Sequence, residues 1–175
     1  MRAAILAGVI ALALIAAWTD WRSRRIPNWL TVSGFVLGLV LNTANAGVLG
    51  LKASLFGAGL GLLLLLPFVL LRSLGAGDWK LAGAVGAFVG PGLLLNLLVW
   101  SVFVVGAMAL VLVIYKARVR ETLRNMKRLL FSLATFRQPG EEVSLDNPHA
   151  LKVPYGVALA LTVVLWGVGR MLGRI

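Results

Sequence analysis

The chain has 175 residues, of which 60% are hydrophobic and 13% charged, and it contains no cysteine. Soluble domains average about 45–50% apolar and about 25% charged residues, so this composition excludes an ordinary soluble domain. The lack of cysteine excludes disulfides, thiolate metal sites and cysteine nucleophiles. A formal net charge of +11 is, in a membrane protein, typical of cytoplasmic loops and anionic lipid, and we expect no nucleic-acid partner.

Five stretches lack charged side chains, namely residues 3–19, 26–51, 53–71, 81–115 and 153–169. A transmembrane helix needs about 20 apolar residues, so four of the stretches each supply one span. In the second stretch, the polar residues 42–45 predict a loop at the membrane exit. In the fourth, Gly90, Pro91 and Gly92 predict a break between a short helix over residues 78–89 and a full one over residues 93–115. The sequence therefore predicts an all-α polytopic membrane protein, with six transmembrane helices and a short fourth helix in a single domain (1–175).

The distribution of lysine and arginine predicts the orientation of these helices. With both termini outside, thirteen of these residues lie on the cytoplasmic side and four outside, as the positive-inside rule requires. A cleavable signal peptide is the alternative interpretation of residues 3–17. Its positive region would contain only Arg2, and the arginines that follow the segment argue against it.

Residues 116–152 form the one sizeable hydrophilic stretch, which we expect to be a cytoplasmic loop. Its first half repeats apolar residues at helical spacing with arginine and lysine between them, which predicts a basic amphipathic helix on an anionic leaflet. A solvated continuation of the fifth helix is the alternative. The only histidine, His149, has no partner that would suggest metal or triad chemistry.

Two acidic residues, Asp20 and Asp78, adjoin apolar helices, whereas the other four lie in the cytoplasmic loop. Asp78 ends a GxGD motif with Gly75 and Gly77 at the start of the fourth helix. The predicted topology brings Asp20 and Asp78 to the same membrane face, where a carboxylate is costly and therefore a functional candidate. The structural alternatives are a helix N-cap for Asp78 and pairing with nearby arginines for Asp20.

Paired carboxylates at a membrane edge have a specific chemistry. At a separation of about 4 Å, ionising both would cost about 4 kcal/mol at an effective dielectric constant near 20, so the pair would hold one proton. One carboxylate then accepts a proton from water while the other hydrogen-bonds the carbonyl under attack, which is acid–base peptide hydrolysis without a metal or other cofactor. Gly75 and Gly77 would leave room for an extended substrate chain beside the acid.

Three motifs carry a resemblance to a known family: Asp20 followed by Ile26, Pro27 and Asn28; Gly75, Gly77 and Asp78 followed by Lys80; and residues 153–158. The chain resembles the type IV prepilin peptidases, the GxGD aspartyl proteases of the bacterial membrane. In particular, it is similar to the short members that accompany Flp/Tad pilus systems. Larger members carry a cysteine-bound zinc extension and methylate the trimmed pilin, and this chain lacks those cysteines.

The resemblance implies a multi-pass protein of the bacterial cytoplasmic (inner) membrane that cuts the basic leader from prepilins or pseudopilins. By position, Asp20 and Asp78 correspond to the two catalytic aspartates, and Pro27 and Asn28 are expected to be structural. Lys80 matches a recurring family residue, with anchoring to lipid phosphates as its structural alternative. Trp79 is bulkier than expected beside a catalytic acid.

The remaining acids suggest a substrate contact. Glu141, Glu142 and Asp146 could dock the basic leader, although a flexible solvated loop is the alternative. Two other functions stay open. One is an inactive pilus-assembly scaffold that binds anionic lipid or pilin. The other, a transporter with Asp20 and Asp78 as a proton relay, is disfavoured because both acids lie at a membrane edge rather than at mid-depth.

Overall fold

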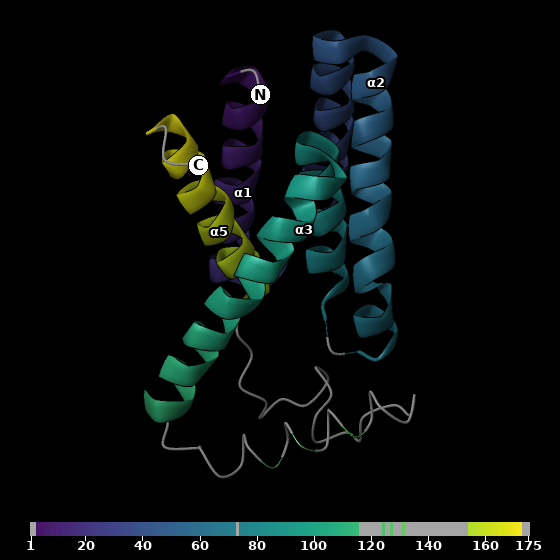
Figure 1. Ribbon diagram of the computed structural model, residues 1–175. Helices are drawn as coiled ribbons and strands as arrows, with labels where there is room; N and C mark the ends of the chain where they lie inside the picture. Colours follow the sequence, from purple (N-terminus) through teal and green to yellow (C-terminus); the bar gives the residue numbers. More distant parts are fainter. Residues whose placement is uncertain are drawn as a thin grey trace.

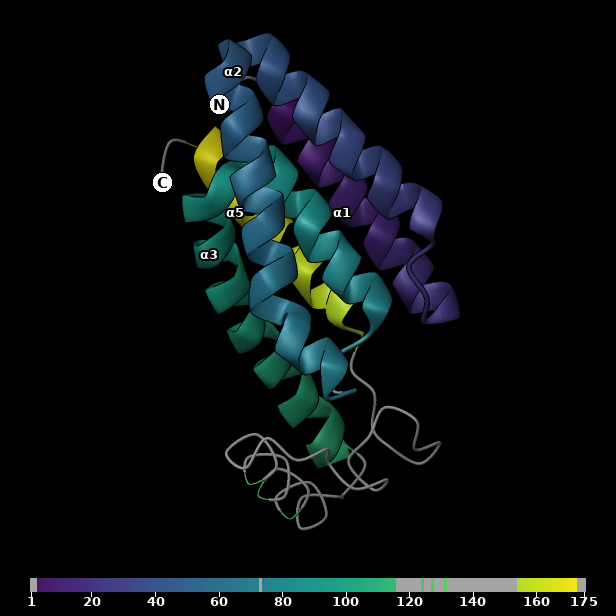
Figure 2. The ribbon, with the colours of Figure 1, turned by 90° about the vertical axis from the view of Figure 1, so that its right-hand side faces the viewer.

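The computed structural model describes residues 3–72, 74–115, 124, 127, 131 and 154–172. Its main elements are α1 (Ala3–Ser23), α2 (Asn28–Leu70), α3 (Ala76–Tyr115) and α5 (Tyr155–Met171). The described part of the chain contains helices and no strand, as predicted. Figure 1 shows the helices as one bundle, with the starts of α3 and α5 toward its lower end, and Figure 2 shows the α1–α2 connection toward the same end. The first and last described residues lie toward the opposite end. The lower end contains Asp20 and Asp78 and is called the acid end from here on.

Two of the four elements are pairs of helices joined across a sharp break. In α2 the backbone leaves helical geometry at Ala46 and at Gly47, which has a φ of +59°. The two arms of α2 run side by side in opposite directions (Figures 1 and 2). In α3 the break lies at Gly90, with a φ of +76° that glycine adopts without strain. The predicted break after residue 89 is therefore confirmed.

The prediction of an exit loop at residues 42–45 is wrong, because the turn lies slightly later in the sequence. These residues are helical, and the chain turns at Ala46 and Gly47 instead. The polar side chain of Asn42 has another use: its amide donates hydrogen bonds to the carbonyls of Ala87 (2.8 Å) and Phe88 (2.9 Å). A polar residue in an apolar stretch thus marks a contact between helices rather than the end of a helix.

This contact satisfies carbonyls that the break in α3 leaves open. Pro91 has no N–H, so it cannot donate to the carbonyl four residues earlier, at Ala87. The Ala87 carbonyl instead accepts hydrogen bonds from Asn42 and from the buried Ser54 hydroxyl (2.6 Å). Because an unpaired carbonyl is costly in an apolar interior, these two side chains make the break tolerable.

Small residues allow the second arm of α2 and the first arm of α3 to pack with their backbones almost in contact. A Cβ placed on Gly57 would collide with the backbone of Gly86, and a Cβ on Gly86 with the backbone of Gly57. Close approach through small residues is typical of packing between membrane helices. The first arm of α3 is thereby held in the centre of the bundle, where Leu81, Val85 and Phe88 are fully buried.

The outer surface of the bundle is strongly apolar. Large side chains such as Trp100, Phe103 and Val111 are more than 60% exposed. A patch of this kind on a soluble protein would promote aggregation, whereas lipid covers it at no cost. Three helices, α1, α2 and α3, are long and apolar enough to cross a membrane, and α5 is a shorter apolar helix. The protein is therefore a membrane protein.

Candidate active site

Asp20 lies in the last turns of α1 and is buried, with only 6% of its surface exposed. Its Oδ2 atom has no hydrogen-bond partner. The backbone N–H groups of Gly156 and Val157, in the first turn of α5, interact with the carboxylate, and the charge of Arg24 reaches it as well. The free N–H groups of a helix N-terminus stabilise a nearby negative charge, so the start of α5 stabilises the ionised form of Asp20.

Asp78 lies in the first turn of α3, which begins at Ala76. It is therefore not the N-cap residue that the structural alternative assumed. Its carboxylate interacts with the backbone N–H groups of Gly75 and Gly156, and the charge of Asp20 acts on it directly. The two aspartates are thus close enough for the charge of one to act on the other, near Gly156 at the start of α5. They come from helices far apart in the sequence and lie at the acid end of the bundle.

The motif glycines are used in a way that differs from the prediction. A Cβ on Gly77 would lie 3.2 Å from Cβ of Ile26, so the space beside this glycine is filled by the chain itself. A Cβ on Gly75 would meet only the Asp78 side chain, at 3.0 Å from its Oδ2. The expected room for a substrate strand is therefore not beside Gly77. Because Gly77 has no side chain, Ile26 can pack directly against α3 beside the acids.

Lys80 has a specific protein partner. Its ammonium group donates a hydrogen bond to the side-chain oxygen of Asn28, at 2.9 Å. Pro27 immediately precedes α2, and its carbonyl accepts the N–H groups of Leu30 and Thr31. The hydrogen bond between Lys80 and Asn28 thus joins the second motif of the sequence to the first.

Trp79 turns away from the acids, although it follows Asp78 directly. Its indole N–H donates to the carbonyl of Leu62 in α2, at 2.6 Å. The bulk of this side chain therefore packs between α3 and α2 and does not obstruct the carboxylates.

Sequence reasoning placed three residues near the acids, Ile26, Tyr155 and Gly156, in the family motifs but assigned them no role in the site. The Tyr155 hydroxyl lies 3.1 Å from the hydroxyl of the buried Ser101, and the charge of Asp78 reaches this tyrosine. A Cβ on Gly156 would lie 2.9 Å from Asp20 Oδ2, so only glycine brings its N–H this close to the acid. Two of the three lie in the motif at residues 153–158, which was the available signal.

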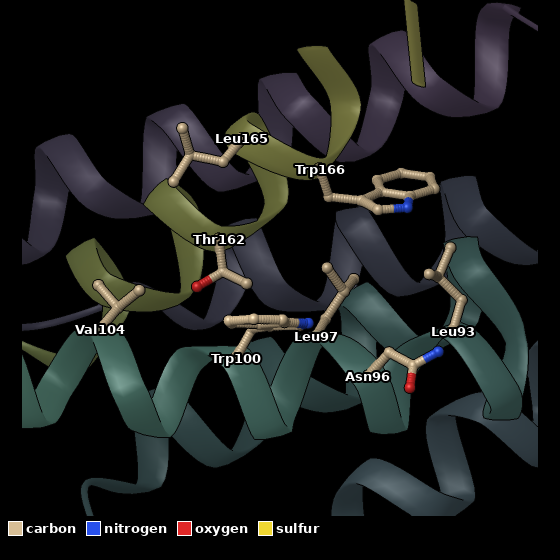
Figure 3. Close-up of a pocket in the computed structure, with 8 residues that line it drawn as sticks. All are labelled: Leu93, Asn96, Leu97, Trp100, Val104, Thr162, Leu165 and Trp166. Atoms are coloured by element: carbon tan, nitrogen blue, oxygen red, sulfur yellow. The ribbon is translucent and has the colours of Figure 1, made fainter. Parts of the chain in front are cut away.

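The predicted leader-docking residues Glu141, Glu142 and Asp146 lie outside the described residues, as does the expected amphipathic helix. A cavity of about 560 Å³ lies elsewhere, between α3 and α5 (Figure 3). Its lining residues are Leu93, Asn96, Leu97, Trp100, Val104, Thr162, Leu165 and Trp166. Neither aspartate lines it and its walls are mostly apolar, so it is not the place where hydrolysis would occur.

The arrangement around the acids suits acid–base chemistry. Two carboxylates of like charge share a largely buried space, one of them with an oxygen that lacks a partner. Such a pair favours one shared proton, which supplies an acid and a base at the same point. Backbone N–H groups from the first turn of α5 fix the position of the pair.

Comparison with protein families gives an independent result. A family model described as the type IV leader peptidase family matches residues 7–111, which is more than half of the chain and includes both aspartates. No curated protein and no solved structure matched the chain. With this match over helices α1 and α2 and most of α3, the chain belongs to the type IV leader peptidase family and is a membrane peptidase.

Proposed function

We propose that the protein is an aspartyl endopeptidase that removes the short basic leader from Flp-like prepilins at the cytoplasmic face of the bacterial inner membrane. The observation that carries this proposal is that Asp20 and the helix that holds Asp78 converge at Ile26 and Gly156, where Asp20 Oδ2 is buried without a partner and the charge of Asp20 acts on Asp78. Family membership supports a peptide substrate, and the three motifs that resemble short prepilin peptidases support the prepilin class.

In the proposed reaction, the ionised member of the aspartate pair takes a proton from a water molecule as that water attacks the scissile carbonyl. The protonated member donates a hydrogen bond to the carbonyl oxygen and stabilises the charge that develops there. The unpartnered Oδ2 of Asp20 is a position for the shared proton or for the attacking water. Proton transfer then belongs to the pair, and the two acids exchange roles over the cycle.

The proposed orientation follows from charge. Six helical segments cross the membrane, with both termini outside and the acid end facing the cytoplasm. The acid end carries Arg22, Arg24 and Arg25 at the end of α1, and an anionic leaflet attracts such a cluster. A leader that emerges into the cytoplasm would reach the aspartates without crossing the bilayer.

The test is co-expression with a candidate prepilin, with cleavage followed by the shift in pilin mass. Asp20→Asn and Asp78→Asn should each abolish cleavage while the protein still inserts and folds. Glu121→Gln makes the same chemical change at an acid that belongs to none of the three motifs and should cleave normally. Cleavage at the normal rate by either aspartate variant would overturn the aspartyl mechanism. An uncut prepilin with the wild-type chain would favour an inactive scaffold.

A further inference from the structure

Residues 26–28, where α1 connects to the start of α2, contact α3 and α5 beside the acids. Ile26 precedes Pro27 and is 8% exposed, although it lies in a connection at the end of the bundle. Segments of this kind usually lie on the surface, since a buried loop strands backbone groups. Burial of Ile26 in this connection therefore needs a reason.

Ile26 is inserted between two glycines that belong to the site. On one side, Gly77 of α3 packs against it, so that an added Cβ would lie 3.2 Å from Ile26 Cβ and 3.4 Å from its backbone nitrogen and oxygen. On the other side, an added Cβ on Gly156 of α5 would lie 3.0 Å from Ile26 Cδ1 and 2.9 Å from Asp20 Oδ2. One side chain thus spaces α3 from α5 beside the acids.

Asn28 gives the segment a second hold on α3. It receives the hydrogen bond of Lys80, two residues after Asp78. A hydrogen bond from an ammonium group to a neutral acceptor is stronger than one between neutral partners. The position of Asp78 relative to the start of α2 is therefore fixed from both sides, by packing at Ile26 and by a polar contact at Asn28.

We propose that Ile26 and the Lys80–Asn28 pair form a clasp that holds Asp20 and Asp78 at the separation at which they can share one proton. These are positioning residues, because they act through the two carboxylates. The inference rests on the proposed function, since a fixed separation matters only if the acids work as a pair. It also assigns Lys80 a role that differs from anchoring to lipid phosphates.

A double-mutant cycle separates these two roles of Lys80. Lys80→Met should lower kcat about fivefold with little change in KM, which is the loss expected for one solvent-exposed hydrogen bond. Asn28→Leu should have the same effect, and the double variant should be no worse than either single one. Lys80→Arg keeps a donor and should restore most activity. A Lys80→Met effect that persists unchanged in the Asn28→Leu background would overturn the clasp in favour of a lipid contact.

The packing half of the clasp has its own variants. Ile26→Ala should lower kcat by about tenfold or more, because small displacements of catalytic groups are costly. Ile26→Val keeps the Cβ branch that faces Gly77 but removes the Cδ1 atom that contacts Gly156, so its kcat should fall between those of Ile26→Ala and the wild type. Lys52→Met, which removes a lysine from α2 far from the acids, is the matched control and should leave kcat unchanged.

A measurement without catalysis keeps the clasp distinct from the proposed function. The chain has no cysteine, so Ser23→Cys and Ala76→Cys place two spin labels at the end of α1 and the start of α3 with both acids intact. Ile26→Ala and Lys80→Met should lengthen or broaden the distance distribution between the labels in membranes, and Lys52→Met should not. An unchanged distribution in both variants would overturn the clasp even if the aspartates prove catalytic. A changed distribution would support it even if no prepilin is cut.

Discussion

The two ends of the bundle differ in how their buried polar groups are paired. At the end far from the acids, the break at Gly90 frees carbonyls in an apolar interior, and Asn42 and Ser54 satisfy them. At the acid end, the chain buries Asp20 and leaves its Oδ2 without a partner. A satisfied buried polar group stabilises a fold, whereas an unsatisfied one costs stability and persists where function needs it. The contrast supports the proposal that the acid end is the site of catalysis.

The largest effect that tests this contrast is expected at Gly156. Gly156→Val would force its side chain against Asp20 Oδ2 and Ile26 Cδ1, and we expect kcat to fall about a hundredfold because the pair is displaced. Gly59→Val makes the same change in α2, where no atom lies within 4 Å of an added Cβ. Steady-state cleavage by the two purified variants is the comparison, and equal activities would contradict the site geometry.

The far end should respond in stability and not in chemistry. Asn42→Leu leaves the Phe88 carbonyl without this donor, and we expect the free energy of unfolding to fall by about 1–3 kcal/mol. Cleavage per folded molecule should change less than about twofold.

Thr43→Val is the control for that change, because the Thr43 hydroxyl donates only within its own helix, to Leu39. Its effect on unfolding in detergent should be about 0.5 kcal/mol or less. A large loss of kcat in folded Asn42→Leu would show that the two ends are coupled, against the division proposed here.

The contact between Tyr155 and Ser101 should have a smaller effect on activity. Tyr155→Phe removes one hydrogen bond that fixes the start of α5 against α3, and we expect kcat to fall about three- to tenfold. Ser101→Ala should match it, with no further loss in the double variant. A loss confined to Tyr155→Phe would mean that the hydroxyl acts on the substrate instead.

The smallest effect is expected where only charge is involved. Reversing Glu141, Glu142 or Asp146 to lysine should raise KM for a basic leader about threefold at low salt and leave kcat unchanged, because surface charges act mainly on encounter. The comparison is run at low and high ionic strength. Kinetics that do not change in any of the three variants would remove the docking role proposed for these acids.

Local patterns in the sequence predicted much of the fold. Charge-free stretches gave the helical membrane class, and Pro91 between two glycines gave the break in α3. The turn at Gly47 was placed too early because Asn42 was interpreted as a loop residue. Its partners, the carbonyls of Ala87 and Phe88, are remote in the sequence. Only Pro91 gave a clue, since it leaves the Ala87 carbonyl in need of a donor.

The site was predictable in its acids but not in their surroundings. Asp20 and Asp78 stand out because charges are rare beside apolar helices. Ile26 belongs to the first motif, but its contacts with Gly77 and Gly156, like the partner of Lys80, depend on how α2, α3 and α5 pack. Contacts of this kind are set by tertiary packing and have no local periodicity that the sequence would reveal.

The most direct measurement compares Asp20→Asn, Asp78→Asn and the double variant in single-turnover cleavage of one prepilin. If the acids act as one unit, each single variant should lose at least about a thousandfold in rate, and the double variant should lose no more. Independent losses that multiply in the double variant would contradict a shared active site at the acid end, as would a single variant that keeps the wild-type rate.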